Sequence, residues 1–210
     1  TRYWRDWSSD VCSSDLTEAL MNRSNMYVNA GDLDLALADL DRAITHKPNI
    51  SQAYFSRGNV HYYKNNYEAA IYDYTRTIAL APDGPSAYQN RAACYMAIKQ
   101  YDRALADYNT TRKLTPKDPD LYLNLCYLKL EMKDEPGAMR DLDQAIALGA
   151  RKASAFYSRG LYRYQHKDYK GAIADMDAAL FLEDTLAFAY MYRAIARAEL
   201  KQYAAAFADF

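Results

Sequence analysis

Residues 51–84 read SQAYFSRGNVHYYKNNYEAAIYDYTRTIALAPDG, and the same 34-residue pattern repeats from Thr17 to the end of the chain. The eighth position of every unit is small: Ser24, Gly58, Ala92, Cys126, Gly160 and Ala194. Twelve residues later an alanine follows: Ala36, Ala70, Ala104, Ala138, Ala172 and Ala206. Three residues further stands an aspartate: Asp39, Asp73, Asp107, Asp141, Asp175 and Asp209. A fixed period of this length indicates stacked supersecondary units rather than one closed core.

Each unit is predicted to form two amphipathic helices, because its apolar residues fall three and four positions apart in two separate stretches. The residues between the stretches are typical of a tight turn followed by a helix N-cap. They are Gly31-Asp32, Asn65-Asn66, Lys99-Gln100, Lys133-Asp134, Lys167-Asp168 and Lys201-Gln202. Pro48, Pro82 and Pro116 are expected to end second helices.

The pattern resembles the tetratricopeptide repeat (TPR) family. The unit at residues 51–84 carries the best copy of its signature, with Tyr54, Gly58, Ala70, Tyr74 and Pro82 at the expected positions. The resemblance implies an all-α fold, a right-handed α-solenoid of antiparallel helix pairs with about five and a half repeats. The repeats are expected at 17–50, 51–84, 85–118, 119–152 and 153–186, with a partial one at 187–210.

Residues 1–16 break both the register and the composition of the repeats. The run Asp6–Leu16 looks like a translated sequencing-library adapter, so we expect 1–16 to be a non-native or disordered head. The alternative is a serine-rich regulatory arm. At the other end Phe210 halts the chain inside the sixth repeat, which predicts that the parent protein continues in both directions.

Composition excludes several classes of function. A net charge of −1 argues against nucleic-acid binding, which needs a concentrated positive field. No apolar run approaches the roughly 20 residues of a membrane span. Cys94 and Cys126 have no metal-ligand spacing and are read as structural thiols, and the three histidines are scattered. With no nucleophile–base set and no phosphate-binding loop, we expect neither catalysis nor a cofactor or metal.

The resemblance implies that the first helices line a concave groove, which is where a protein or peptide partner is expected to bind. Carboxamides can grip the backbone of an extended peptide, and aromatic rings anchor its side chains. The candidate groove residues are Asn22, Asn25, Phe55, Asn59, Tyr62, Asn90, Asn124, Tyr127, Tyr157 and Tyr164, with Ser56, Tyr63, Ser158 and Tyr192 beside them. The structural alternative is that the asparagines are solvated and half of the tyrosines are core. This face is expected not to pack against neighbouring helices.

Some TPR proteins hold the carboxylate of chaperone tails with lysine, asparagine and arginine. The matching positions here are Met21, Asn25 and Ser56 in one window, and Phe55, Asn59 and Asn90 in the next. Because lysine and arginine are absent from them, chaperone C-terminal tails are disfavoured as partners.

An arginine precedes the small residue in five of the six units: Arg23, Arg57, Arg91, Arg159 and Arg193. An antiparallel helix pair brings this column close to the aspartate column, so repeated Arg–Asp ion pairs with a structural role are predicted. In the fourth unit Leu125 replaces the arginine, and Asp141 is expected to lack that partner.

Two functions follow from these observations. The first is a protein-interaction scaffold that binds a partner segment in the groove. The second is a substrate-recruiting arm of a larger enzyme, such as a glycosyltransferase, protease or kinase, whose catalytic domain lies outside this sequence. The flanking gene sequence distinguishes the two.

Overall fold

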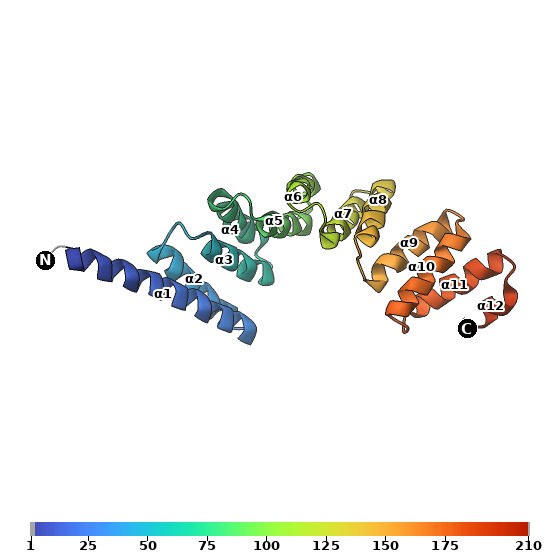
Figure 1. The fold of residues 1–210 in the computed structure, drawn as a ribbon, viewed down its shortest axis with the longest axis horizontal. Helices are drawn as coiled ribbons and strands as arrows, with labels where there is room; N and C mark the ends of the chain where they lie inside the picture. Colours follow the sequence, from blue (N-terminus) through green and yellow to red (C-terminus); the bar gives the residue numbers. More distant parts are fainter. Residues whose placement is uncertain (1–2, 210) are drawn as a thin grey trace. The chain divides into compact units, whose positions relative to one another are not determined.

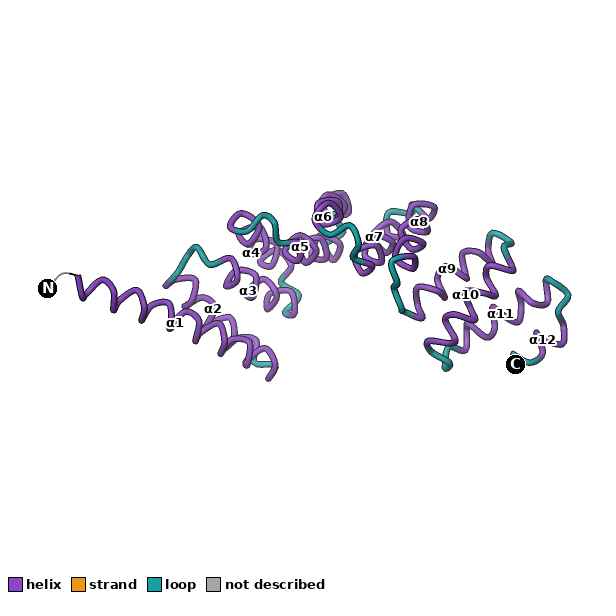
Figure 2. The backbone as a smooth tube through the Cα atoms, in the orientation of Figure 1, coloured by secondary structure: helices purple, strands orange, loops and turns teal. Residues whose placement is uncertain are grey.

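The computed structural model describes the backbone of residues 3–209 and the side chains of residues 15–209. Every regular element in this part of the chain is an α-helix (Figures 1 and 2). The helices group into two units, residues 1–116 and 117–210. The predicted all-α array of helix pairs is confirmed, because each first helix packs against the second helix that follows it.

The first unit contains three helix pairs. They are α1 (Tyr3–Ala30) with α2 (Leu33–His46), α3 (Ser51–Tyr63) with α4 (Tyr67–Leu80), and α5 (Pro85–Ala97) with α6 (Tyr101–Leu114). The backbone of α1 is helical from Tyr3, so this helix has no boundary at Thr17. The side chains of residues 1–14 lie outside those described, and the non-native origin of residues 1–16 stays a prediction.

The second unit also contains three pairs. They are α7 (Pro119–Glu131) with α8 (Glu135–Ala147), α9 (Ala153–Gln165) with α10 (Tyr169–Leu182), and α11 (Ala187–Glu199) with α12 (Tyr203–Phe207). The final residue, Phe210, lies outside the described residues. No helix in the described range is both long enough and apolar enough to cross a membrane.

The turn inside each pair is made by one residue in the left-handed region. Gly31 has φ 85°, and Asn65, Lys99, Lys133, Lys167 and Lys201 have φ between 59° and 65°. This residue turns the chain so that the N–H of the next residue donates to a carbonyl in the last turn of the first helix, as Asn66 N does to His61 O at 2.8 Å. Four consecutive units therefore place a lysine side chain where glycine is the residue without steric cost.

Replacing Lys99 with glycine is expected to stabilise the fold by about 0.5 kcal/mol, because the left-handed strain that lysine carries exceeds the extra chain entropy of glycine. Urea unfolding followed by circular dichroism measures the change. Lys113→Gly, an exposed lysine within α6, is the matched control and is expected to destabilise by up to about 1 kcal/mol. A loss of stability in Lys99→Gly would contradict the strain argument.

The predicted N-caps form in only two of the six second helices. Asp134 Oδ1 accepts from Gly137 N, and Asp168 Oδ1 accepts from Gly171 N, each at 3.0 Å. The remaining four positions, Asp32, Asn66, Gln100 and Gln202, make no side-chain cap, so the prediction was wrong for them. The physical reason is space. A Cβ at Gly137 would lie 1.9 Å from the Asp134 carboxylate, whereas the other four helices carry leucine, alanine or arginine at the corresponding position.

Within each unit, part of the core lies where the second helix of one repeat packs against the first helix of the next. Ala36 and Leu40 meet Val60, Ala70 and Tyr74 meet Cys94, and Met176 and Leu180 meet Ala189. The thiols of Cys94 and Cys126 are free and buried, and burial raises their pKa values to about 12 and about 11. They are accordingly unreactive packing groups, as the sequence predicts.

The small eighth residue receives a side chain from its own second helix. A Cβ at Gly58 would lie 2.9 Å from the Tyr74 ring, and a Cβ at Gly160 would lie 3.0 Å from Met176 Cε. Glycine at these two positions lets a large residue lie flat against the first helix.

Candidate functional site

The face of α3 that meets α5 carries a hydrogen-bonded network of two asparagines and a tyrosine. Asn59 Oδ1 accepts from the hydroxyl of Tyr74 at 2.8 Å and from Asn90 Nδ2 at 3.0 Å. Tyr74 is 1% exposed, so its hydroxyl anchors Asn59 from inside the fold. Burial raises the pKa of Tyr74, and the group therefore remains a neutral donor. The two carboxamides are thus held in fixed orientations before any partner arrives.

Two hollows lie on either side of Asn59 in the first unit. One has a volume of about 170 Å³ and is lined by Asn59, Tyr62, Tyr63, Tyr74, Asn90 and Ala93. The second has a volume of about 190 Å³ and is lined by Ser24, Asn25, Val28, Leu40, Ser56, Asn59, Val60 and Tyr63. Asn59 and Tyr63 belong to both, so the hollows adjoin, and no charged residue lines either. Together they are called the amide groove here.

The amide groove contains four of the ten predicted site residues, Asn25, Asn59, Tyr62 and Asn90. Asn22 is exposed and lines neither hollow. Phe55 instead packs on Tyr74, with ring centroids 5.8 Å apart, and belongs to the core between α4 and α5. The expectation that this face does not pack against neighbouring helices was wrong for Asn59 and Asn90, because their hydrogen bond joins α3 to α5.

The other four predicted residues lie in the second unit. Tyr157 and Tyr164 both contact Tyr192, with centroid distances of 6.3 Å and 5.6 Å. Tyr157 and Tyr192 also pack against the core of α10 and α11. Asn124 is half-buried and Tyr127 is 48% exposed. Among the described residues, neither makes a hydrogen bond or a ring contact with Tyr157, Tyr164 or Tyr192.

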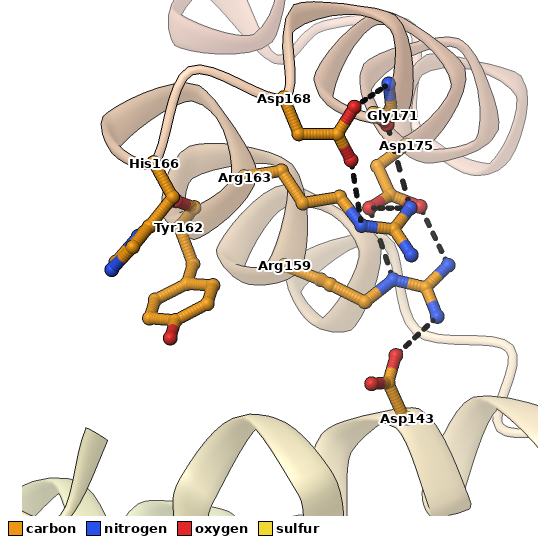
Figure 3. Close-up of polar contacts among 8 residues, drawn as sticks. All are labelled: Asp143, Arg159, Tyr162, Arg163, His166, Asp168, Gly171 and Asp175. Atoms are coloured by element: carbon orange, nitrogen blue, oxygen red, sulfur yellow. Dashed lines mark hydrogen bonds and ion pairs between the residues drawn. The ribbon is translucent and has the colours of Figure 1, made fainter. Parts of the chain in front are cut away.

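The predicted Arg–Asp pairs are confirmed. Arg57 donates from Nε and Nη2 to the two oxygens of Asp73 at 2.9 and 2.7 Å, and Arg91 makes the same paired contact with Asp107 at 2.8 Å for both bonds. Arg159 does so with Asp175 (Figure 3). The pairs Arg23–Asp39 and Arg193–Asp209 complete the set. Hydrogen bonding to Arg23 lowers the pKa of Asp39.

Sequence reasoning missed a second contact of the same arginines. The guanidinium also reaches back to the preceding repeat, from Arg57 to Asp41 at 2.7 Å and from Arg159 to Asp143 at 2.9 Å (Figure 3). The corresponding partners of Arg91 and Arg193 are Thr75 and Asp177. A pattern in the sequence could have revealed this contact. The residue two positions after each repeated aspartate is polar, and it lies sixteen positions before the arginine position of the next repeat. The arginines therefore join repeats as well as the helices within one.

Asp141 lacks an arginine partner, as predicted from Leu125, but it is not left unpaired. Lys129 Nζ lies 2.5 Å from Asp141 Oδ2. Lys129 stands at the eleventh position of its repeat, where Arg163 and Arg197 approach Asp175 and Asp209 at 2.8 Å. The buried aspartate can thus be neutralised by a cation at the seventh position of its repeat or by one at the eleventh.

The eleventh position of the second repeat is His61, whose surroundings are unusual. Its Nε2 lies 3.9 Å from Asp73 Oδ2, and its buried Nδ1 has no hydrogen-bond partner. Burial lowers the pKa of His61 below its ordinary value of 6.5. The imidazole is therefore neutral at pH 7, and Asp73 depends on Arg57 for its charge pairing.

Among the described residues, no group of three histidine, cysteine, aspartate or glutamate side chains is arranged to hold a metal ion. The polar groups that the fold brings together are the Arg–Asp pairs, which are satisfied internally, and the carboxamides of the amide groove.

Comparison with solved structures supports the architecture. PilF of Pseudomonas aeruginosa superposes with a TM-score of 0.78 at 16% identity, covering 94% of this chain and 90% of PilF. A tetratricopeptide repeat protein from Parabacteroides merdae gives 0.72 at 20% identity, covering 93% of this chain and 77% of that one. YrrB, described as a TPR protein with an unusual peptide-binding site, gives 0.65 at 18% identity, with 81% and 88% covered. At these identities the likeness concerns the fold alone.

Comparison with curated protein sequences found no match. The sequence profile of the tetratricopeptide repeat family matches residues 21–85, 55–119 and 131–186. Together these segments cover well over half of the chain and lie within the helical array described above. The chain belongs to the tetratricopeptide repeat family.

Proposed function

We propose that this scaffold binds an extended peptide segment in the amide groove, with the carboxamides of Asn59 and Asn90 holding the peptide backbone. The TPR family is generally a non-catalytic, protein-binding one, which gives the class of function. The observation that supports this particular site is the Asn59–Asn90–Tyr74 network between the two hollows.

The network leaves one hydrogen-bonding group of each asparagine unused. Asn59 Oδ1 and Asn90 Nδ2 are occupied, while Asn59 Nδ2 and Asn90 Oδ1 have no hydrogen-bond partner among the described residues. A free donor beside a free acceptor is complementary to the C=O and N–H of a peptide backbone. Turning both carboxamides over would exchange the two roles and still leave one of each. Because the network is already ordered, binding costs little additional side-chain entropy.

A groove without charged lining predicts binding that depends little on salt. Long-range attraction between charges weakens as ionic strength rises, whereas hydrogen bonds and ring contacts in a hollow persist. A peptide selected against this chain should therefore keep its affinity when salt is raised.

Replacing Asn90 with alanine is expected to weaken a bound peptide by about 1 kcal/mol, roughly five-fold in Kd, because one backbone hydrogen bond is lost. The peptides are first selected from a random phage-displayed library with the intact chain, and Kd is then measured by calorimetry. Asn59 keeps its bond to Tyr74 in this variant, so the fold should persist. Asn109→Ala, a half-buried asparagine on α6 outside both hollows, is the control.

Two results would count against the site. If Asn90→Ala binds the selected peptides as tightly as the parent chain does, the carboxamide is not a contact. If Asn109→Ala weakens them equally, the loss has a cause other than the amide groove.

A further inference from the structure

We infer that the segment recognised by the amide groove is uncharged, proline-rich and in the polyproline II conformation. This inference rests on the function proposed above and names the chemical class of its ligand. It follows from the spacing of the hydrogen-bonding pairs, from their free atoms and from the tyrosines beside them.

A pair of polar side chains occupies the same two positions in two successive parts of the groove, one repeat apart. Asn59 and Asn90 occupy the ninth position of one repeat and the sixth of the next, and they line the first hollow. Asn25 and Ser56 occupy the same two positions one repeat earlier and line the second hollow. The first helices that carry them approach one another directly, α1 beside α3 and α3 beside α5. Neighbouring packed helices lie about 8–10 Å apart, so the two pairs are separated by about that distance.

A polyproline II helix matches this separation. It has three residues per turn and rises about 3.1 Å per residue, so the same side of its backbone returns every 9 Å or so. A β-strand turns the same side to the groove every second residue, about 7 Å, or every fourth, about 13 Å. The three-residue period matches the spacing of the helices more closely than either strand spacing does.

The free donor of the groove suits the same backbone. Polyproline II has no internal hydrogen bonds, so its carbonyl oxygens remain available as acceptors. The bond from Asn90 and the bond from Tyr74 both end on Asn59 Oδ1, which directs the Asn59 amide hydrogens away from the network. Those hydrogens can donate to a ligand carbonyl, and this contact does not need the N–H that proline lacks.

Tyrosine rings form the side of the groove. Tyr63 is 60% exposed and lines both hollows, while Tyr62 stands beside it with ring centroids 6.3 Å apart. Proline rings dock on aromatic surfaces of this kind, and the preformed polyproline II helix loses little entropy on binding. A charged ligand side chain would lose water in either hollow without gaining an oppositely charged partner.

The test uses the full 210-residue chain and a dye-labelled, end-blocked decaproline, with binding followed by fluorescence anisotropy. The controls are an alternating Gly-Ser decamer, which is flexible and uncharged, and an alternating Thr-Gln decamer, which favours strands. Decaproline should bind at least about ten-fold more tightly than either control, and raised salt should not reverse the order.

Tyr63→Ala should weaken the binding of decaproline by about five-fold or more, because a ring shared by both hollows is removed. Tyr72→Ala is the matched control. Tyr72 is 61% exposed, lies on α4 and lines neither hollow, so its replacement should leave the affinity for decaproline unchanged. Circular dichroism confirms that both variants are folded.

Each other outcome overturns the inference. If Gly-Ser or Thr-Gln decamers bind as well as decaproline and lose affinity in Asn90→Ala, the groove binds peptides of another class. If decaproline does not bind, or if Tyr63→Ala leaves its affinity unchanged, the groove does not select this conformation. A different result contradicts the proposed groove function: peptides selected from the random library would bind Asn90→Ala as tightly as the parent chain.

Discussion

Gly58→Leu is expected to unfold the second repeat and to lower the stability of the chain by more than about 4 kcal/mol, the range reached by severe overpacking of a core. A Cβ alone would lie 2.9 Å from the Tyr74 ring, and leucine adds three more carbon atoms at that place. The ring cannot move aside, because it is 1% exposed and its hydroxyl is bound to Asn59. Urea titration monitored by circular dichroism measures the loss.

Three further variants separate overpacking from a general effect of leucine. Gly84→Leu should be tolerated, since a Cβ at Gly84 meets only Ala81 O at the ordinary distance of 3.5 Å. Gly58→Ala should cost about 1–3 kcal/mol, and Tyr74→Leu in the same chain should recover most of it. At the positions of Gly58 and Tyr74, the first repeat already combines a small residue with leucine, Ser24 with Leu40. A stable Gly58→Leu chain with native circular dichroism would show that the close approach has no structural role.

Arg57→Leu is expected to destabilise the chain by about 3 kcal/mol at pH 7, the lower end of the range for breaking a buried ion pair. The aspartate that loses its partner, Asp73, is 1% exposed, while the Arg57 side chain is 17% exposed. In the parent chain His61 is neutral at that pH and supplies no charge to Asp73. Because lowering the pH adds protons to the carboxylate and to His61, which lies 3.9 Å from it, the loss should shrink as the pH is lowered.

The fourth repeat provides the matched rescue. There Leu125 stands at the arginine position, and Lys129 pairs with Asp141 at 2.5 Å. The double variant Arg57→Leu with His61→Lys copies this arrangement and should regain most of the lost stability. Equal stabilities of the single and double variants would mean that the charge of Asp73 is balanced in another way. A loss that stays constant between pH 7 and pH 5 would also contradict the stranded carboxylate.

The Arg–Asp pairs show which contacts a repeated sequence can predict. Arg91 and Asp107 are sixteen residues apart, and an antiparallel helix pair brings positions of that separation together regardless of the other side chains. The contact from Arg159 to Asp143 of the preceding repeat was not predicted. It depends on the angle at which one repeat stacks on the next, which results from side-chain packing between them.

The N-caps illustrate the same limit at a smaller scale. Asp32 and Asp134 look equivalent in the sequence, yet only Asp134 caps its helix. Gly137 makes the difference, because it leaves the space that the carboxylate occupies. A rule about one residue type therefore fails where the outcome depends on a neighbour three positions away.

By itself the sequence determined the family, the two helices of each repeat, the close approach at Gly58 and the Arg–Asp pairs, because each of these depends on periodicity and local geometry that recur in every unit. Only the tertiary structure decided which candidate residues share a site. It joined Asn59 to Asn90 and Tyr74, placed Asn25 and Tyr63 beside them, and assigned Phe55 to the core. The reason is that the direction of a side chain on a helix surface is set by packing across repeats, and a single period of 34 residues does not contain that information.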